Sequence, residues 1–265
     1  MTDAEVAAYM RSKDPGTILT TVLTKLAPVG LGGSGPIPDD NVLPIDPIAA
    51  IKAGRYNAMP VLASNTRDEG KLFAPFLALF GGPAGFIMDD ATRFRLMANF
   101  DPDAPAPALV HDIVHPAYLP VDTPVTGWTA RTELLDDIFM RANRVDVLDA
   151  VKAQQPNAVW YYRFDWDEEP EPWDDVYGAA HAFDLPFIFG NFGPSLFSNA
   201  ANSTANEPGR LALSNAMMQS LAAVARTGDP NNPAGPPWPT WPLGLVFDAS
   251  DTTLDIHVDP NASLE

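Results

Sequence analysis

Cysteine is absent from the 265-residue sequence. Without a thiol the chain can form no disulfide, no thiolate metal site and no cysteine nucleophile. Basic residues are scarce too, because 16 lysines and arginines stand against 34 aspartates and glutamates and leave a net charge of −18. A surface of this charge repels the phosphates of nucleic acids and of anionic lipids. We therefore expect no nucleic-acid partner and no membrane partner.

Long hydrophobic runs are also missing. No window approaches the roughly 20 uncharged apolar residues that a membrane-spanning helix needs. The first thirty residues carry Asp3, Glu5, Arg11 and Lys13, whereas a signal peptide would need an apolar core there. These features predict a soluble protein with no targeting segment in the printed residues, and they leave open whether it is cytoplasmic or secreted. The 46% share of hydrophobic residues is enough for a large core.

Twenty-eight prolines predict long irregular loops between the regular elements. The opening residues predict two short helices, with Asp3 as an N-cap and Asp14-Pro15 as the break between them. Further along, hydrophobic periodicity predicts helices and strands that alternate. In chain order these are a strand at 60–63 that runs into a polar turn at 65–70, an amphipathic helix within 132–155, a strand at 158–165, a helix within 210–227, and two short edge strands at 245–248 and 253–258.

This alternation is typical of an α/β protein with a mostly parallel sheet flanked by helices, and no change of composition marks a boundary within residues 1–265. Glu69 and His181 both lie beyond the carboxyl end of a predicted strand. Because ligands gather at the carboxyl ends of parallel strands, the two side chains are candidates to meet in space. Taken singly, however, Glu69 is typical of a solvated turn, and His181 is also compatible with core packing.

Four segments, in order, resemble the type-B carboxylesterase and cholinesterase family of α/β hydrolases. They are MPVLASNTRDEGKLF (59–73), VWYYRFDW (159–166), VYGAAHAFDLPFIFGN (176–191) and LSNAMMQSLAAVARTGDPN (213–231). The resemblance implies that residues 1–265 form the C-terminal part of an α/β-hydrolase domain. It also implies that the chain acts on small-molecule carboxylic esters and needs no cofactor.

In that family the glutamate of the DEG turn is the triad acid, and the histidine of the G-x-x-H segment is the triad base. The resemblance therefore implies catalytic roles for Glu69 and His181 in a Ser-His-Glu triad. It also implies a supporting role for Asp184, where the family holds a buried carboxylate. A helix-capping aspartate is an equally good interpretation of Asp184.

The nucleophile of such a triad is not found in this sequence. The family carries its serine in a G-x-S-x-G elbow. Ser34 has Pro36 where the second glycine should be, and Ser195 has no closing glycine. The glycine-rich segment 30–35 is interpreted as a flexible connection. We therefore expect the serine to come from an absent N-terminal half or from a companion polypeptide, and we expect the chain to be inactive alone.

Two other classes of function stay open at this stage. One is an esterase-like binding or interaction module without catalytic activity. The other is a metal-dependent hydrolase, because His111 and His115 stand four residues apart and resemble the H-E-x-x-H pattern of zinc enzymes. Asp112 is shorter than the glutamate of that pattern and Pro116 interrupts a helix, so we expect no metal site. The acidic stretch 165–175 is predicted to be a solvated loop, with Trp166 and Trp173 as candidate walls of a substrate gorge.

Overall fold

The computed structural model describes residues 2–26, 38–104 and 106–262. Their packing divides the chain into two compact units, residues 1–50 and 51–265. The glycine-rich segment 30–35, predicted to be a flexible connection, lies outside the described residues. The assignment of residues 1–265 to one portion of a hydrolase domain stays a prediction.

The first unit is helical at its beginning, with α1 (Asp3–Arg11), α2 (Pro15–Thr21) and a π-helical turn (Val22–Leu26). Asp14 caps α2 by accepting a hydrogen bond from the backbone N of Thr17 at 2.8 Å, and Pro15 takes the first helical position. The predicted break is therefore confirmed. The predicted N-cap of α1 was wrong by one residue: Thr2 caps the helix and forms a capping box with Glu5.

In the described part of the second unit, helices combine with four strands that form one sheet. Its strands are β1 (Val61–Thr66), β2 (Val159–Phe164), β3 (Gly244–Ala249) and β4 (Leu254–Asp259). Its helices, with α3 at the boundary of the units, are α3 (Pro47–Lys52), α4 (Glu69–Leu72), α5 (Asp90–Ala98), α6 (Trp128–Asp136), α7 (Ala142–Gln154), α8 (Trp173–Val176), α9 (Leu185–Phe189), α10 (Ser198–Ala201) and α11 (Glu207–Thr227). Short 3₁₀-helices cover Ala74–Phe80, Val110–Asp112 and Pro116–Tyr118.

The sheet has the strand order β1-β2-β3-β4, in which the first two pairings are parallel and the third is antiparallel. The prediction of a mostly parallel sheet is therefore confirmed. All six residues of β2 are buried, as its aromatic and β-branched sequence predicts. β3 was expected to be an edge strand, but it is an interior strand, because β4 pairs with its other side. The outer edge of β1 pairs with no strand among the described residues.

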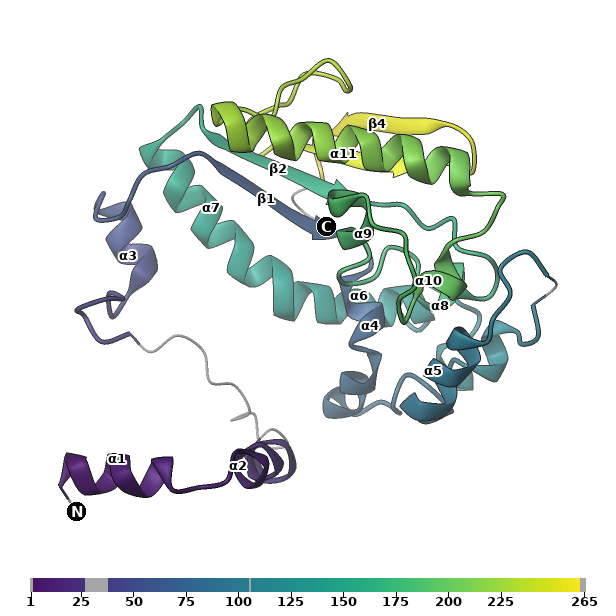
Figure 1. The fold of residues 1–265 in the computed structure, drawn as a ribbon, viewed down its shortest axis with the longest axis horizontal. Helices are drawn as coiled ribbons and strands as arrows, with labels where there is room; N and C mark the ends of the chain where they lie inside the picture. Colours follow the sequence, from purple (N-terminus) through teal and green to yellow (C-terminus); the bar gives the residue numbers. More distant parts are fainter. Residues whose placement is uncertain (1, 27–37, 105, 263–265) are drawn as a thin grey trace. The chain divides into compact units, whose positions relative to one another are not determined.

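Alternate residues of β2 face two different cores. Trp160, Tyr162 and Phe164 pack with α11, whereas Val159 and Tyr161 pack with α7. Figure 1 accordingly shows α11 and α7 on opposite sides of the sheet. These two helices cover the two faces of the sheet, which explains why β2 has hydrophobic residues on both of its faces.

The long helix predicted within residues 132–155 is interrupted. It begins earlier, as α6, passes through a π-helical turn at Asp137–Arg141 and continues as α7. Leu135 and Leu148, both within the predicted amphipathic range, are buried. The helix predicted within 210–227 is α11, and it ends at Gly228, whose φ of 74° is the left-handed conformation that glycine favours. In the described part of the chain no helix combines the length and apolar character needed to cross a membrane.

Candidate active site

Glu69 lies where β1 gives way to α4, at the carboxyl end of a parallel strand. Its Oε1 accepts hydrogen bonds from the backbone N of Thr66 at 2.9 Å and from Nδ2 of Asn65 at 3.2 Å. The side chain is only 7% exposed. The solvated turn that the sequence alone suggested for Glu69 is therefore wrong, since this carboxylate is buried and held in one orientation.

Gly70 explains why the glutamate is followed by glycine. A Cβ atom at this position would lie 2.2 Å from the backbone O of Thr132 and 2.9 Å from Cβ of Leu135. α4 therefore packs so closely against α6 that position 70 has no room for a side chain. The backbone N of Gly70 also donates a hydrogen bond to Oδ1 of Asp136. This contact fixes the start of α4 and, with it, the backbone of Glu69.

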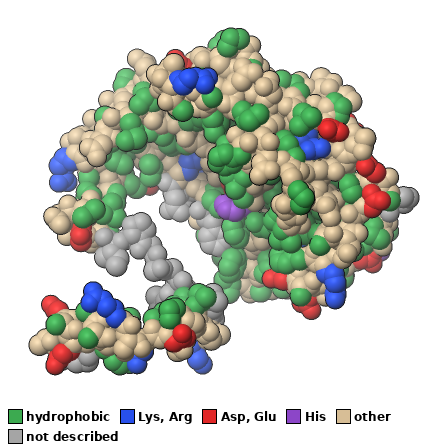
Figure 2. Space-filling view, in the orientation of Figure 1, with side chains coloured by type: hydrophobic (Ala, Val, Ile, Leu, Met, Phe, Trp, Pro, Cys, Tyr) green, Lys and Arg blue, Asp and Glu red, His purple; other side chains and the backbone are tan. Residues whose placement is uncertain are grey.

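His181 lies in the loop between α8 and α9, and its Nδ1 shares a hydrogen bond with Oε2 of Glu69. The imidazole is 41% exposed, so it is not a packed core histidine. The imidazole lies beside the ring of Phe73, with 4.9 Å between the ring centroids and 51° between the ring planes. A carboxylate on Nδ1 holds the proton on that nitrogen and leaves Nε2 as the basic nitrogen. Figure 2 shows a histidine among hydrophobic side chains at the centre of this face.

Two corners with positive φ shape the histidine loop. Gly178 has a φ of 49°, and a Cβ there would lie 2.9 Å from Oδ2 of Asp68, so glycine is required twice over. Ala182, directly after the histidine, has a φ of 68° although it is not glycine. Such a conformation costs about 1 kcal/mol or more and is concentrated at functional sites. The loop is therefore bent on both sides of the imidazole.

Asp68 ties the acid loop to the base loop, although sequence reasoning missed it. Its backbone N donates to the O of Ala179 at 2.9 Å, and its Oδ2 accepts from the N of Ala179 at 3.2 Å. Burial acts to raise the pKa of Asp68, but the charges of Lys71 and Arg67 outweigh it and hold that pKa below its ordinary value. The three-residue spacing of Asp68 and Lys71 is the signal that could have found this pair.

Asp136 is a second carboxyl group that the sequence did not single out. Burial raises its pKa to about 8, and the nearby charges of Asp68 and Glu69 add to that rise, against the lowering effect of the Gly70 N–H. At neutral pH Asp136 is therefore mostly protonated.

Asp184 is buried, at 8% exposure, and Oδ2 accepts a hydrogen bond from the hydroxyl of Tyr162 at 3.4 Å. Burial raises its pKa, and the charge of Glu69 raises it further. Although Asp184 precedes α9, its side chain makes no capping hydrogen bond to that helix. The capping interpretation is therefore wrong, whereas its supporting role for the triad stays a prediction.

The remaining candidates from the sequence lie elsewhere. His111 belongs to one 3₁₀-helix and His115 precedes another, so the two do not share the helical turn that the zinc pattern requires. Residues 2–26, 38–104 and 106–262 contain no group of three side chains suited to hold a metal ion. Ser34 falls outside the described residues. The hydroxyl oxygen of Ser195 accepts a hydrogen bond from the backbone N of Ser198, and the hydroxyl oxygen of Ser198 accepts one from the backbone N of Ser195.

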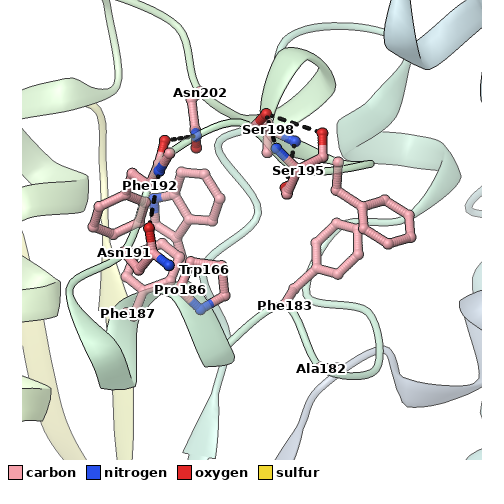
Figure 3. Close-up of a pocket in the computed structure, with 13 residues that line it drawn as sticks. Trp166, Ala182, Phe183, Pro186, Phe187, Asn191, Phe192, Ser195, Ser198 and Asn202 are labelled. Atoms are coloured by element: carbon pink, nitrogen blue, oxygen red, sulfur yellow. Dashed lines mark hydrogen bonds between the residues drawn. The ribbon is translucent and has the colours of Figure 1, made fainter.

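The acidic stretch 165–175 is not the solvated loop that the sequence predicts. Asp165 and Glu169 are buried, and Trp166 and Trp173 are each 1% exposed. Burial raises the pKa of Glu169 well above its ordinary value. The loop is therefore part of the core that supports the histidine segment. Trp173 lines none of the pockets described, whereas Trp166, although buried, lines one (Figure 3), so its place in the wall of a substrate gorge stays a prediction.

Comparisons with known proteins identify the family and the fold of the chain. The carboxylesterase family matches residues 1–263 of the chain. Para-nitrobenzyl esterase of Bacillus subtilis (strain 168) is 28% identical over 196 residues, which are 74% of this chain and 35% of that protein. Acetylcholinesterase 1 of Caenorhabditis briggsae is 26% identical over 213 residues, which are 74% of this chain and 32% of that protein.

Among solved structures, the carboxylesterase EST55 of Geobacillus stearothermophilus at pH 6.8 matches with a TM-score of 0.58 and 24% identity. The match covers 96% of this chain and 48% of that one. The α/β-hydrolase fold expected from the sequence is therefore confirmed. The chain spans about a third of the length of the curated relatives it matches.

Proposed function

Because this chain belongs to the carboxylesterase family, we propose that it supplies the acid and the base of a Ser-His-Glu triad that hydrolyses carboxylic esters. Glu69 is the acid and His181 is the base. The serine comes from polypeptide outside residues 1–265, in the same chain or in a companion polypeptide. The observation that carries the proposal is the hydrogen bond between the buried Glu69 carboxylate and Nδ1 of the half-exposed imidazole.

The chemistry follows from that pairing. Nε2 of His181 takes the hydroxyl proton of the serine while the serine oxygen attacks the ester carbonyl carbon. The imidazolium then gives this proton to the departing alkoxide, so an alcohol leaves and an acyl-enzyme remains. Water repeats the sequence: His181 takes its proton, the acyl bond to serine breaks, and the serine regains a proton as the carboxylic acid leaves. Glu69 holds the imidazole in one tautomer and stabilises its positive charge throughout.

The substrate class rests on the names of the relatives, an esterase and an acetylcholinesterase, which support a small carboxylic ester. The proposed division of the triad is supported by two observations. The sequence has no G-x-S-x-G elbow. Within the described ranges, His181 forms no hydrogen bond with a serine hydroxyl.

A fluorophosphonate probe tests this function, because it reacts only with a serine that its triad has activated. We expect no labelling of residues 1–265 alone. In a preparation that also contains the serine-bearing polypeptide, intact-mass and peptide spectrometry should place the label on a serine outside these residues. A label on any serine within residues 1–265 would overturn the division of the triad.

Histidine variants of the same preparation provide the control. His181→Ala should lower the rate of labelling by about 10⁶-fold, because the nucleophile loses its base. His257→Ala is the matched control, since that side chain is 52% exposed on β4 and bonds only Asp255 among the described residues. Equal labelling rates in the two variants would remove His181 from the mechanism.

A further inference from the structure

A chain of hydrogen bonds leads from the candidate acid to helix α7. Oε1 of Glu69 accepts a hydrogen bond from Nδ2 of Asn65 at 3.2 Å. Oδ1 of Asn65 accepts in turn a hydrogen bond from Nη1 of Arg144 at 2.5 Å. The other carboxylate oxygen of Glu69 bonds Nδ1 of His181. Arg144 is therefore linked to the imidazole through Asn65 and Glu69.

The alternation of residues along β1 explains why Asn65 meets α7. Val61 and Ala63, at alternate positions of the strand, pack in the core cluster that contains residues of α7. Asn65 is the next residue of that series, so its side chain lies on the same face of the sheet. Arg144 is in the first turn of α7 and 79 positions away in the sequence. Sequence reasoning singled out neither residue, because only the packing of α7 on β1 brings them together.

Tyr161 of β2 holds the guanidinium of Arg144 in place. The same Nη1 donates a hydrogen bond to the hydroxyl oxygen of Tyr161 at 2.7 Å, and Cζ of Arg144 lies 4.7 Å from the centre of the ring. Tyr161 is fully buried, and its ring packs edge-on against Trp241. Burial raises the pKa of Tyr161 to about 12, so its hydroxyl is neutral at physiological pH. A rigid, neutral acceptor therefore fixes the nitrogen that binds Asn65.

The guanidinium decides which way the amide of Asn65 faces. A guanidinium only donates hydrogen bonds, so the amide oxygen has to face Arg144. The amide NH₂ group then faces Glu69, whose ionised carboxylate only accepts. If the amide were turned around, two oxygens would face each other at one end and two donors at the other. Arg144 thus selects the orientation in which Asn65 stabilises a charged Glu69.

This orientation also determines which oxygen of Glu69 remains for the base. Oε1 accepts from Nδ2 of Asn65 and from the backbone N of Thr66, at 3.2 and 2.9 Å. Oε2 is then the oxygen that bonds Nδ1 of His181. Two donors on one oxygen oppose rotation of the carboxylate, and a carboxylate that does not rotate holds the imidazole in one orientation.

We propose that Arg144 is a positioning residue of the triad, because it holds the amide of Asn65 so that this amide orients Glu69 and, through Glu69, the imidazole of His181. The inference rests on the proposed ester hydrolysis and adds two residues behind the acid. Both residues act on the reaction only through the Glu69 carboxylate. Their loss should therefore change the hydrogen bond of the base.

Exchange of the His181 Nδ1 proton with water tests the proposal on residues 1–265 themselves. Arg144→Met removes the donor and keeps an unbranched side chain. We expect the Nδ1 proton, followed by ¹H–¹⁵N NMR, to exchange about tenfold faster, because a less constrained Glu69 protects it less. The backbone amides of β2 should keep their exchange rates, which separates this effect from a general loss of stability. An Nδ1 proton that exchanges at its original rate would overturn the proposal.

Two further variants provide the control and the rescue. Arg141→Met is the matched control, since Arg141 is 42% exposed and bonds Asp137 at 2.9 Å. It should leave the exchange of the Nδ1 proton unchanged. Arg144→Lys should restore slow exchange, because a single nitrogen of Arg144 makes the bonds to Asn65 and Tyr161, and an ammonium group can donate to two acceptors. Exchange as fast in Arg144→Lys as in Arg144→Met would contradict the proposal.

A double-mutant cycle tests whether Arg144 acts through Asn65. In the preparation that contains the serine-bearing polypeptide, Arg144→Met and Asn65→Leu should each slow fluorophosphonate labelling about tenfold. The double variant should be no slower than the single ones, whereas independent actions would multiply to about a hundredfold and overturn the proposal. Asn65→Leu leaves the contact between Arg144 and Tyr161 in place. It therefore gives a test of its own if Arg144→Met does not fold, and unchanged labelling of Asn65→Leu would contradict the proposal.

His181→Ala separates this inference from the proposed function. If His181→Ala abolishes labelling but Arg144→Met and Asn65→Leu do not slow it, the triad stands and the positioning role fails. If labelling does not depend on His181, the triad itself fails, and Arg144 has no base to position.

Discussion

The two halves of the candidate site are built in opposite ways. Glu69 is 7% exposed, accepts two hydrogen bonds from Thr66 and Asn65, and begins a helix whose packing at Gly70 leaves no room for a Cβ atom. His181 is 41% exposed and lies in a loop between two residues with positive φ, Gly178 and Ala182. The acid is thus immobilised in the core, and the base reaches the surface.

This difference matches what each group must do. A carboxylate that orients an imidazole works best where other groups fix it and little water competes for it. A base must instead keep its second nitrogen accessible to the proton that it takes. The rigid carboxylate of Glu69 therefore binds one side of the imidazole, at Nδ1, and part of the ring stays exposed.

The largest expected effect comes from removing the charge of the rigid half. Glu69→Gln keeps an oxygen for the backbone N of Thr66 but can place an amide against Nδ1 of His181. The imidazole then loses the partner that holds its proton on Nδ1, and the serine-containing enzyme should lose about 10⁴-fold in kcat. Nitrogen NMR of His181 should show the proton moving from Nδ1 to Nε2.

Glu133→Gln is the matched control, because Glu133 is exposed on α6. It should change neither the rate nor the tautomer. If the proton stayed on Nδ1 in Glu69→Gln, the carboxylate would not be the group that orients His181. The rigid placement of Glu69 would then have no role in holding the base.

A smaller effect is expected from crowding the rigid half. Gly70→Ala brings a methyl group against the backbone O of Thr132, so α4 must move away from α6. We expect the free energy of unfolding in urea to fall by about 2–3 kcal/mol. Gly235→Ala is the control, because nothing lies within 4 Å of a Cβ there. Equal stabilities of the two variants would show that α4 is free to shift, and that the acid is not rigidly placed.

The sequence predicted the elements around the site better than the contacts between them. Local patterns placed β2, α11 and the turn that carries Glu69, because periodicity, aromatic strands and turn residues act over a few neighbours. The pairing of Glu69 with His181 needed the family resemblance, since the two are 112 positions apart. No local pattern reports a contact over that distance.

The groups that make Glu69 rigid could not be predicted for the same reason. Gly70 and Asp136 meet only when α4 packs on α6, and the buried acidic stretch 165–175 has the composition of a surface loop. Composition indicates solubility of a segment in isolation, whereas burial here depends on partners from distant elements. The interior position of β3 likewise depends on β4, which pairs with it from the far side.

The smallest expected effect concerns the protonation of the rigid half. Folding raises the pKa of Asp136 to about 8, whereas an unfolded chain ionises aspartate near pH 4. Between those values the folded state holds a proton that the unfolded state has lost, so the free energy of unfolding falls as the pH rises. Asp136→Asn keeps an oxygen for the Gly70 N–H and cannot ionise, and should therefore remove this decline. The free energy of unfolding of both proteins is measured in urea at pH 5 and at pH 8. We expect the difference between variant and unmodified protein to change by on the order of 1 kcal/mol between the two pH values. The change is limited because Asp136 is partly exposed. Asp146→Asn, at an exposed position of α7, is the control. A difference that is the same at both pH values would mean that Asp136 is ionised in the folded protein and shares the negative charge beside the imidazole.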